Sequence, residues 1–99
     1  MEIEVELLGF LRSLAGGREK VRVKISKEFE SPKILTVIRM LGELFGSEFE
    51  RSVVSSSPLG SHKAALILKN GVEVSVLGGL ETPVSHKDKL TLIPVSHGG

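Results

Sequence analysis

The stretch TVIRMLGELFG, residues 36–46, decides the fold because it carries the main helix signal in a chain otherwise patterned as strands. Its apolar side chains recur at the spacing of one helix face, at Val37, Ile38, Leu41, Leu44 and Phe45. Thr36 is a candidate N-cap, because its hydroxyl can accept a hydrogen bond from the first turn. Ser31 followed by Pro32 offers an earlier start, and Gly46 is a candidate C-terminal stop.

Two strand patterns precede this helix. Apolar residues alternate with charged or polar ones over residues 2–7 and again over residues 21–26, the period of a strand with one buried face. The connection contains an apolar segment that Gly16 and Gly17 terminate, with room for a helical turn. The pattern predicts a hairpin with a long connection.

After the helix, Phe49 and Val53 are four residues apart and indicate a second short helical segment. Residues 55–61, SSSPLGS, are typical of a polar surface loop. Residues 64–68 form a short, nearly continuous apolar run, which predicts a central strand covered on both faces.

Two further strand patterns end the chain. Asn70 and Gly71 favour a type I′ turn, which leads into a return strand at residues 72–76. Residues 77–83 are typical of a loop. Leu90, Leu92 and Pro94 predict a last strand, with the proline near its end.

This order of elements is β-β-α-β-β-β and indicates an α+β fold, with one main helix packed on one face of a mixed sheet. If the first and last strands are neighbours, the arrangement is the ubiquitin-like β-grasp. We expect residues 1–99 to form a single β-grasp domain with a flexible C-terminal tail at residues 96–99.

The composition excludes several classes of function. The net charge of +1 gives no electrostatic basis for binding nucleic acid or a membrane surface. There are no cysteines, hence no thiolate metal site, and no pair of histidines has metal-ligand spacing, so we expect no metal. The acidic N-terminus is unlike a signal peptide, and no apolar run approaches the roughly 20 residues of a membrane span. We expect a cytoplasmic protein.

The tail Ser96-His97-Gly98-Gly99 is the one segment that folding does not explain. Two glycines without side chains suit a terminus that enters a narrow channel, and the α-carboxylate of Gly99 is the distinctive group there. Adenylation by ATP would turn this carboxylate into a good acyl donor, and sulfur transfer would then give a thiocarboxylate. An inert, disordered tail is the alternative interpretation.

The whole chain resembles the MoaD/ThiS family of sulfur carriers, and most closely the small subunit of molybdopterin synthase. The similar segments are Leu8 to Gly16, Thr36-Val37 with Leu41 and Leu44, Leu68 to Gly71, Thr82-Pro83-Val84, Lys87 to Leu90, Ile93-Pro94-Val95, and Gly98-Gly99. The family tail often reads Pro-Pro-Val-x-Gly-Gly. Here Ile93 replaces the first proline, and Ser96-His97 adds one residue before Gly98.

The resemblance implies a carrier that is not an enzyme alone and binds no cofactor. An adenylating enzyme of the ubiquitin-activating type would use ATP to activate Gly99, a persulfide-based source would supply sulfur, and Gly98 would precede the reactive carbon. The tail would then enter the large subunit of molybdopterin synthase. The resemblance places partner-binding residues at Arg12, Ile93, Pro94, Val95, Ser96 and His97.

Three other functions remain open from the sequence. A small archaeal-type modifier would form an isopeptide bond between Gly99 and lysines of other proteins. A carrier for tRNA thiolation or for thiamine would use the same terminus. A binding-only β-grasp domain would tolerate deletion of Gly98 and Gly99.

Overall fold

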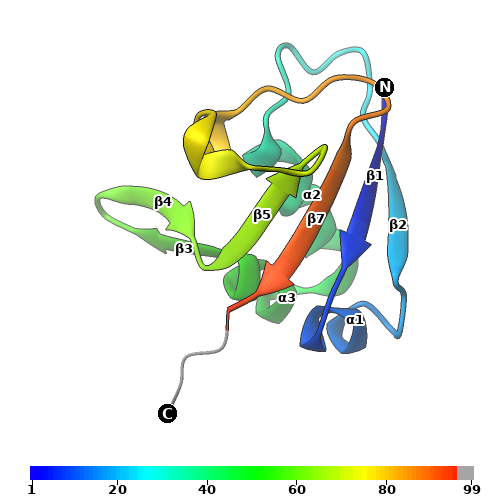
Figure 1. Cartoon of the computed structure of the whole chain (residues 1–99), viewed down its shortest axis with the longest axis vertical. Coiled ribbons are helices and arrows are strands. Elements are labelled where there is room, and N and C mark those ends of the chain that lie inside the picture. Colours follow the sequence, from blue (N-terminus) through cyan, green and yellow to red (C-terminus); the bar gives the residue numbers. More distant parts are fainter. Residues whose placement is uncertain (96–99) are drawn as a thin grey trace.

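The computed structural model describes residues 1–95 and contains a five-stranded sheet with the strand order β2-β1-β7-β5-β6 (Figure 1). The strands are β1 (Glu2–Leu7), β2 (Lys20–Lys24), β5 (Ala65–Lys69), β6 (Val72–Glu73) and β7 (Lys89–Pro94). Neighbouring strands are antiparallel except β1 and β7, which run parallel. The mixed sheet and the adjacent first and last strands confirm the predicted β-grasp fold.

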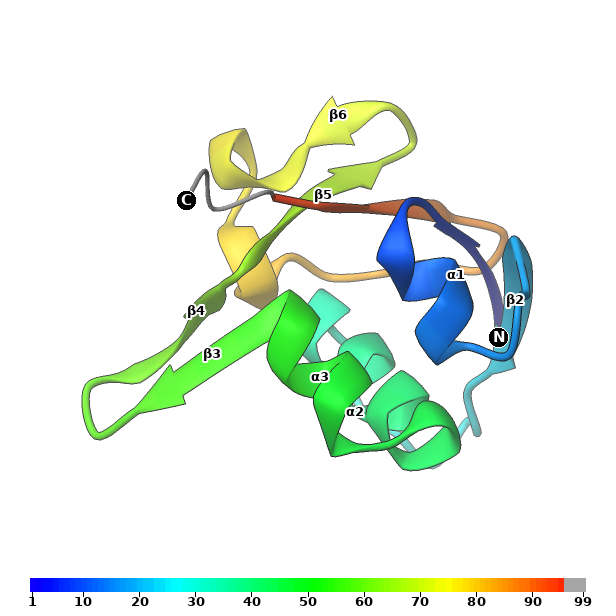
Figure 2. The same ribbon diagram turned by 90° about the horizontal axis from the view of Figure 1, so that it is seen from below.

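Helices cover one face of this sheet (Figure 2). They are α1 (Phe10–Leu14), α2 (Ile34–Phe45) and α3 (Ser47–Val53), and two short 3₁₀ turns, η1 (Val74–Val76) and η2 (Gly79–Glu81), follow β6. Helix α1 confirms the helical turn expected between the first two strands, and α3 confirms the second short helical segment. Within residues 1–95, no helix is both long and apolar enough to cross a membrane.

The alternating pattern of β1 determines which side of the sheet is buried. Ile3, Val5 and Leu7 are fully buried, whereas the glutamates between them are partly exposed. Val5 and Leu7 lie in register with Leu90 and Leu92 of β7, which are also fully buried. A shift of one residue would move this whole apolar set to the solvent side, so burial fixes the register of the central strands.

Helix α2 begins between the two predicted starts. Its first residue is Ile34, and Lys33 is the N-cap. The Thr36 hydroxyl, predicted to cap the helix from outside, instead lies within the first turn and accepts a hydrogen bond from the Lys33 N–H at 3.0 Å. Gly46 ends the helix with a φ of 103°, which confirms the predicted stop.

The buried stripe of α2 differs from the prediction at one position. Leu44 was expected on the buried face but is 64% exposed, and Ile34 is buried instead. Leu44 lies at the border of the stripe, beside the edge strand β2. No further strand of the described chain extends the sheet past β2, so nothing there covers the leucine.

Helices α2 and α3 approach each other closely at Gly42, and we expect Gly42→Ala to destabilise the fold. A Cβ at this position would lie 2.9 Å from the Cβ of Glu50 in α3. In an exposed helix the change would stabilise by about 1 kcal/mol. Here we expect a net loss of about 1–3 kcal/mol in urea unfolding, because the two helices must move apart. A gain in stability would mean that the helices do not touch at Gly42.

The predicted loop at residues 55–61 is wrong, because these residues form most of a two-stranded antiparallel arm. Strand β3 (Val54–Ser57) pairs with β4 (Gly60–Lys63) across a turn at Pro58 and Leu59. The arm projects from the body of the molecule (Figure 1). Alternation reveals only strands with one buried face, and the exposed serines at 55 and 56 pack on no core.

The β5–β6 hairpin confirms the Asn70-Gly71 turn, with φ values of 50° and 82°. Strand β6 is shorter than predicted, because the Glu73 side chain accepts a hydrogen bond from the Ser75 N–H and the backbone turns into η1.

Strand β5 is not covered on both faces, contrary to the prediction. Its buried residues are Ala65 and Ile67, while Leu66 and Leu68 are half-buried. The helices cover only one face of the sheet, so every second side chain of this apolar run lies on the open face (Figure 2). Burial in the core therefore explains Ala65 and Ile67 of this run but does not explain why Leu66 and Leu68 are apolar.

Candidate functional site at the end of strand β7

Strand β7 holds the chain up to the start of the candidate tail. Its last residue, Pro94, is paired with Ala65 of β5, and Val95 follows with 49% of its surface exposed. The predicted site residues Ser96, His97, Gly98 and Gly99 lie outside the described residues.

Pro94 is seated against a glycine at the start of α1. A Cβ built on Gly9 would lie 2.7 Å from the Cγ of Pro94, and Gly9 has a φ of 58° with a ψ of −142°, which only glycine adopts readily. The Leu8 N–H also donates to the Leu92 carbonyl at 3.1 Å. This close approach fixes the point at which the chain leaves the sheet.

Arg12, a predicted partner-binding residue, lies in α1, which packs beside β7. Its Nε donates to the Leu7 carbonyl at 2.8 Å, and its Nη2 lies 3.4 Å from Glu19 Oε1. Both contacts are within the chain, yet 42% of the Arg12 side chain remains exposed. The guanidinium is therefore fixed in position and still accessible to a partner.

The other predicted partner residues lie beside an apolar patch that the sequence did not reveal. Ile93 is half-buried and pairs in register with Leu66, so both side chains lie on the open face of the sheet. Val95, Leu66 and Ala64 line a shallow hollow directly beside the exit of the chain. The apolar run 64–68 is the sequence signal for Leu66, but such a run predicts burial on both faces and does not indicate an exposed patch.

A charged cluster borders the same hollow. Lys63 Nζ lies 2.5 Å from Glu73 Oε1 and also donates to the Ser75 hydroxyl. The hydrogen bond from Lys63 is the main reason that the pKa of Glu73 lies below its ordinary value, against an opposing effect of burial. The cluster ties the base of the arm to the β6–η1 turn.

At its other end, β7 is anchored by Asp88. The carboxylate of Asp88 accepts hydrogen bonds from Asn70 Nδ2 at 2.9 Å and from the Ser85 N–H at 2.7 Å, and Lys69 Nζ lies 3.7 Å away. Burial alone would raise the pKa of Asp88, but these hydrogen bonds and the lysine outweigh it and lower the pKa.

We expect Asp88→Asn to cost about 1–2 kcal/mol at pH 7, because it removes charge-assisted hydrogen bonds at a half-buried site. The folded-state pKa lies below the unfolded value of about 3.9, so this stabilisation is complete above that value. It is lost as the pH falls through the folded pKa. Urea unfolding of both proteins between pH 7 and pH 3 should show the difference shrinking below pH 4. An equal difference at both pH values would contradict this assignment.

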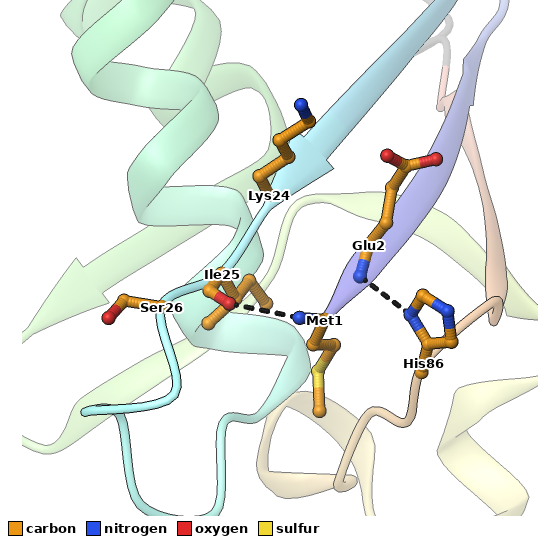
Figure 3. A pocket seen from close by; sticks show the side chains of 6 residues that line it. All are labelled: Met1, Glu2, Lys24, Ile25, Ser26 and His86. Atoms are coloured by element: carbon orange, nitrogen blue, oxygen red, sulfur yellow. Dashed lines mark hydrogen bonds between the residues drawn. The ribbon is translucent and has the colours of Figure 1, made fainter.

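Figure 3 shows a second hollow at the start of β1, beside the first residues of β7 and at the opposite end of that strand from Pro94. There the Glu2 N–H donates to His86 Nδ1 at 3.0 Å, and the Met1 ammonium group donates to the Ile25 carbonyl at 3.2 Å. His86 is exposed, and its hydrogen bond with Glu2 closes the loop before β7 against β1. Among residues 1–95 no group of acidic residues and histidines is arranged to bind a metal ion.

No protein-family model and no curated protein sequence matches this chain. Solved structures match it over nearly its full length. The small archaeal modifier protein 1 (SAMP1) from Methanosarcina acetivorans has a TM-score of 0.77 at 22% identity, covering 99% of this chain and 96% of its own. A chain of the Amycolatopsis orientalis BexX/CysO complex has a TM-score of 0.73 at 26% identity, covering 98% and 99%. The putative molybdopterin converting factor, subunit 1, from Pyrococcus furiosus has a TM-score of 0.72 at 14% identity, covering 97% and 99%.

These neighbours are ubiquitin-like proteins of the MoaD/ThiS type, and the similarity confirms both the fold and the resemblance seen in the sequence. Each is similar in size to the present chain, as the coverage shows. One of them was solved in complex with another protein.

Proposed function

We propose that this chain, which has the ubiquitin-like fold of the MoaD/ThiS sulfur carriers, carries sulfur as a thiocarboxylate on Gly99. The observation that supports the proposal is the arrangement of residues at the end of β7. The central strand holds the chain as far as Pro94, beside an apolar patch, and the sequence continues with Val95 and then Ser96-His97-Gly98-Gly99. The chain acts as a substrate and subunit of other enzymes and is not an enzyme alone.

The chemistry needs no side chain of the carrier. Attack of the Gly99 carboxylate on ATP gives an acyl adenylate and pyrophosphate. Hydrosulfide then forms a C–S bond at the acyl carbon, the C–O bond to AMP breaks, and one proton is released to solvent. The product is the –C(O)S⁻ group. A chain without cysteine can hold sulfur in this form and pass it on as a nucleophile.

The partner surface in this proposal is the patch beside the tail. Leu66, Ile93 and Val95 offer apolar contacts, and Pro94 and Arg12 are fixed by Gly9 and by the Leu7 carbonyl. Apolar anchors surrounded by fixed polar groups are typical of the centre of a protein interface. Ser96 and His97 would extend this surface into the partner, as the spacer before Gly98.

Two partners follow from the proposal: an adenylating enzyme of the ubiquitin-activating type, which consumes ATP, and an acceptor of the sulfur. For the acceptor we propose the large subunit of molybdopterin synthase, in the synthesis of the molybdenum or tungsten cofactor. The similarity to a putative molybdopterin converting factor subunit supports this choice.

A modifier function is the second candidate, and the similarity to SAMP1 favours it. It begins with the same adenylate, but a lysine amine replaces sulfide as the nucleophile and an isopeptide bond forms. Carriers for tRNA thiolation or thiamine would differ only in the acceptor of the sulfur.

The test is intact-protein mass spectrometry after incubation with ATP, an activating enzyme and sodium sulfide. We expect a gain of about 16 Da, from sulfur replacing oxygen, located on Gly99 by fragmentation. The activating enzyme is first shown to be competent by its release of pyrophosphate with this chain. If the adenylate forms and the mass never changes, the carrier function is wrong. Lysine adducts through Gly99 in the same mixture would favour the modifier function.

A further inference from the structure

Strand β2 is an edge of the sheet, and its outer backbone groups are unpaired. Met1 and Ile25 exchange two hydrogen bonds across the ladder between β1 and β2, at 2.8 and 3.2 Å. Because paired groups alternate along an antiparallel ladder, the odd-numbered residues of β2 face β1 and the even-numbered ones face outward. Within residues 1–95, the outward N–H and C=O groups take part in no hydrogen bond, and they belong to Lys20, Arg22 and Lys24.

An apolar groove lies beside this free edge. It has a volume of about 440 Å³ and separates β2 from α2. Val23 lines it from the strand, and Met40 and Leu44 line it from the helix. Leu44 is the exposed leucine that no strand of the described chain covers. A strand added beside β2 would therefore place every second side chain over apolar surface.

The opposite face of the same edge is basic. The three even-numbered residues of β2 point to the open face of the sheet, because the valines between them are buried. Each is in register with a glutamate of β1, and one of these, Glu6, lies 3.3 Å from Lys89 of β7. Arg22 stays 74% exposed although Glu2 is 4.0 Å away. Charge thus alternates from β7 to β1 to β2, and an acidic strand would continue the alternation.

Charge decides between two occupants of this edge. A second copy paired antiparallel through β2 would set its three basic residues beside those of the first, and like charges directly opposite one another are destabilising. Lysines on an edge strand oppose self-association in this way. An acidic segment of another protein meets attraction at the same positions.

We infer that β2 binds an extended segment of another protein, which becomes the sixth strand of the sheet. The segment alternates acidic and apolar residues. Its acidic side chains face the three basic residues of β2, its apolar ones lie over the groove beside Met40 and Leu44, and its backbone pairs with the free groups of the edge. This surface goes beyond the proposed function, because β1 lies between β2 and β7 and the edge is separate from the patch beside the tail.

Fluorescence anisotropy tests the inference with the full chain and a labelled peptide that contains Glu-Val-Glu-Val-Glu. One short added strand buries little area, so we expect a dissociation constant between about 10 µM and 1 mM. Two control peptides separate the contributions. The Lys-Val-Lys-Val-Lys peptide reverses the charge and should bind about tenfold more weakly or worse. The Glu-Glu-Glu-Val-Val peptide keeps the composition but loses the alternation, and it should be weakened to a similar extent.

Two substitutions at one position separate the backbone from the side chain. Arg22→Ala removes one charge and should weaken binding about threefold. Arg22→Pro removes the same charge and also the outward N–H, which the fold does not use, so it should weaken binding about tenfold or more. Leu44→Asp should also weaken it about tenfold, whereas Leu66→Asp, beside the tail, should leave it unchanged. Thermal unfolding of each variant checks that the fold is retained.

A measurement on the native chain needs no substitution. Addition of the Glu-Val-Glu-Val-Glu peptide should shift the NMR amide resonances of Lys20, Arg22 and Lys24, because their N–H groups become paired. These resonances should not shift with the Lys-Val-Lys-Val-Lys peptide at the same concentration.

Four outcomes would overturn the inference. The first is no binding at about 1 mM peptide. The second is equal binding of Glu-Glu-Glu-Val-Val, because charge alone would then suffice. The third is equal binding by the alanine and proline variants of Arg22, and the fourth is a native chain that dimerises through β2. Deletion of Gly98 and Gly99 should leave peptide binding unchanged, so this inference and the sulfur chemistry can fail separately.

Discussion

A chain lacking Gly98 and Gly99 should unfold at the same temperature as the full chain and gain no sulfur at all. Among residues 1–95 the last fully buried side chain is Leu92 and the last residue of the sheet is Pro94, so we expect the fold to form without the two glycines. The proposed chemistry depends on them entirely, because shortening the chain leaves the carboxylate on His97. Thermal unfolding and intact mass on the same sample measure the two effects.

The matched control is deletion of Ser96 alone. It shortens the tail by about 3.5 Å and leaves one residue between Val95 and Gly98, which is the spacing in the Pro-Pro-Val-x-Gly-Gly pattern. Gly98 and Gly99 remain, so this variant should still gain about 16 Da. Sulfur gained by the chain that lacks both glycines would show that the terminal diglycine is not the reactive group.

The parts of the fold that could be predicted are those in which buried and exposed positions alternate with a regular period along the chain. Residues 2–7 and 21–26 alternate because one side of each strand faces the helices, and the turn at Asn70 and Gly71 was visible because both residues tolerate a positive φ. The family resemblance alone predicted a partner surface at Ile93, Pro94 and Val95, and the structure places Ile93 and Pro94 in the last two positions of β7.

The features that the sequence did not predict are those in which the residue type does not match the burial, such as exposed polar strands and apolar residues outside the core. The arm at residues 54–63 has paired strands without a core beneath them, so its serines resemble a loop. Leu66 is half-buried and Leu44 is exposed although both are apolar, and a single sequence cannot distinguish such residues from fully buried ones. Hydrophobicity alone indicates that a residue avoids water, whether in the core or against a partner.

These apolar exceptions occupy two different surfaces. Leu66, Ile93 and Val95 surround the exit of the tail on the open face of the sheet, and Leu44 and Phe29 lie on the helical side. The patch beside the end of β7 and the exposed side of α2 are therefore separate surfaces of the molecule.

Phe49→Ala should cause the largest loss of stability among single core substitutions, about 3–5 kcal/mol. Phe49 is the largest fully buried side chain, and its ring centroid lies 5.4 Å from that of Phe45 in α2. It lies on α3, which packs against both β5 and β7 and leads directly into the arm. Its removal leaves a cavity where the helical layer meets the two strands that form the patch beside the tail.

A domain of this size has a free energy of unfolding of about 5–15 kcal/mol, so the loss is a large share of the total. With a urea dependence of about 1–3 kcal/mol per molar, the midpoint should fall by about 2 M. The matched control is Phe29→Ala, which removes the same side chain from a half-exposed position and should cost below about 1 kcal/mol. If both substitutions had equal effects, Phe49 would not be the centre of the contact between α3 and the sheet. The denaturant slope should stay unchanged in both variants, since the unfolded chain exposes nearly the same surface.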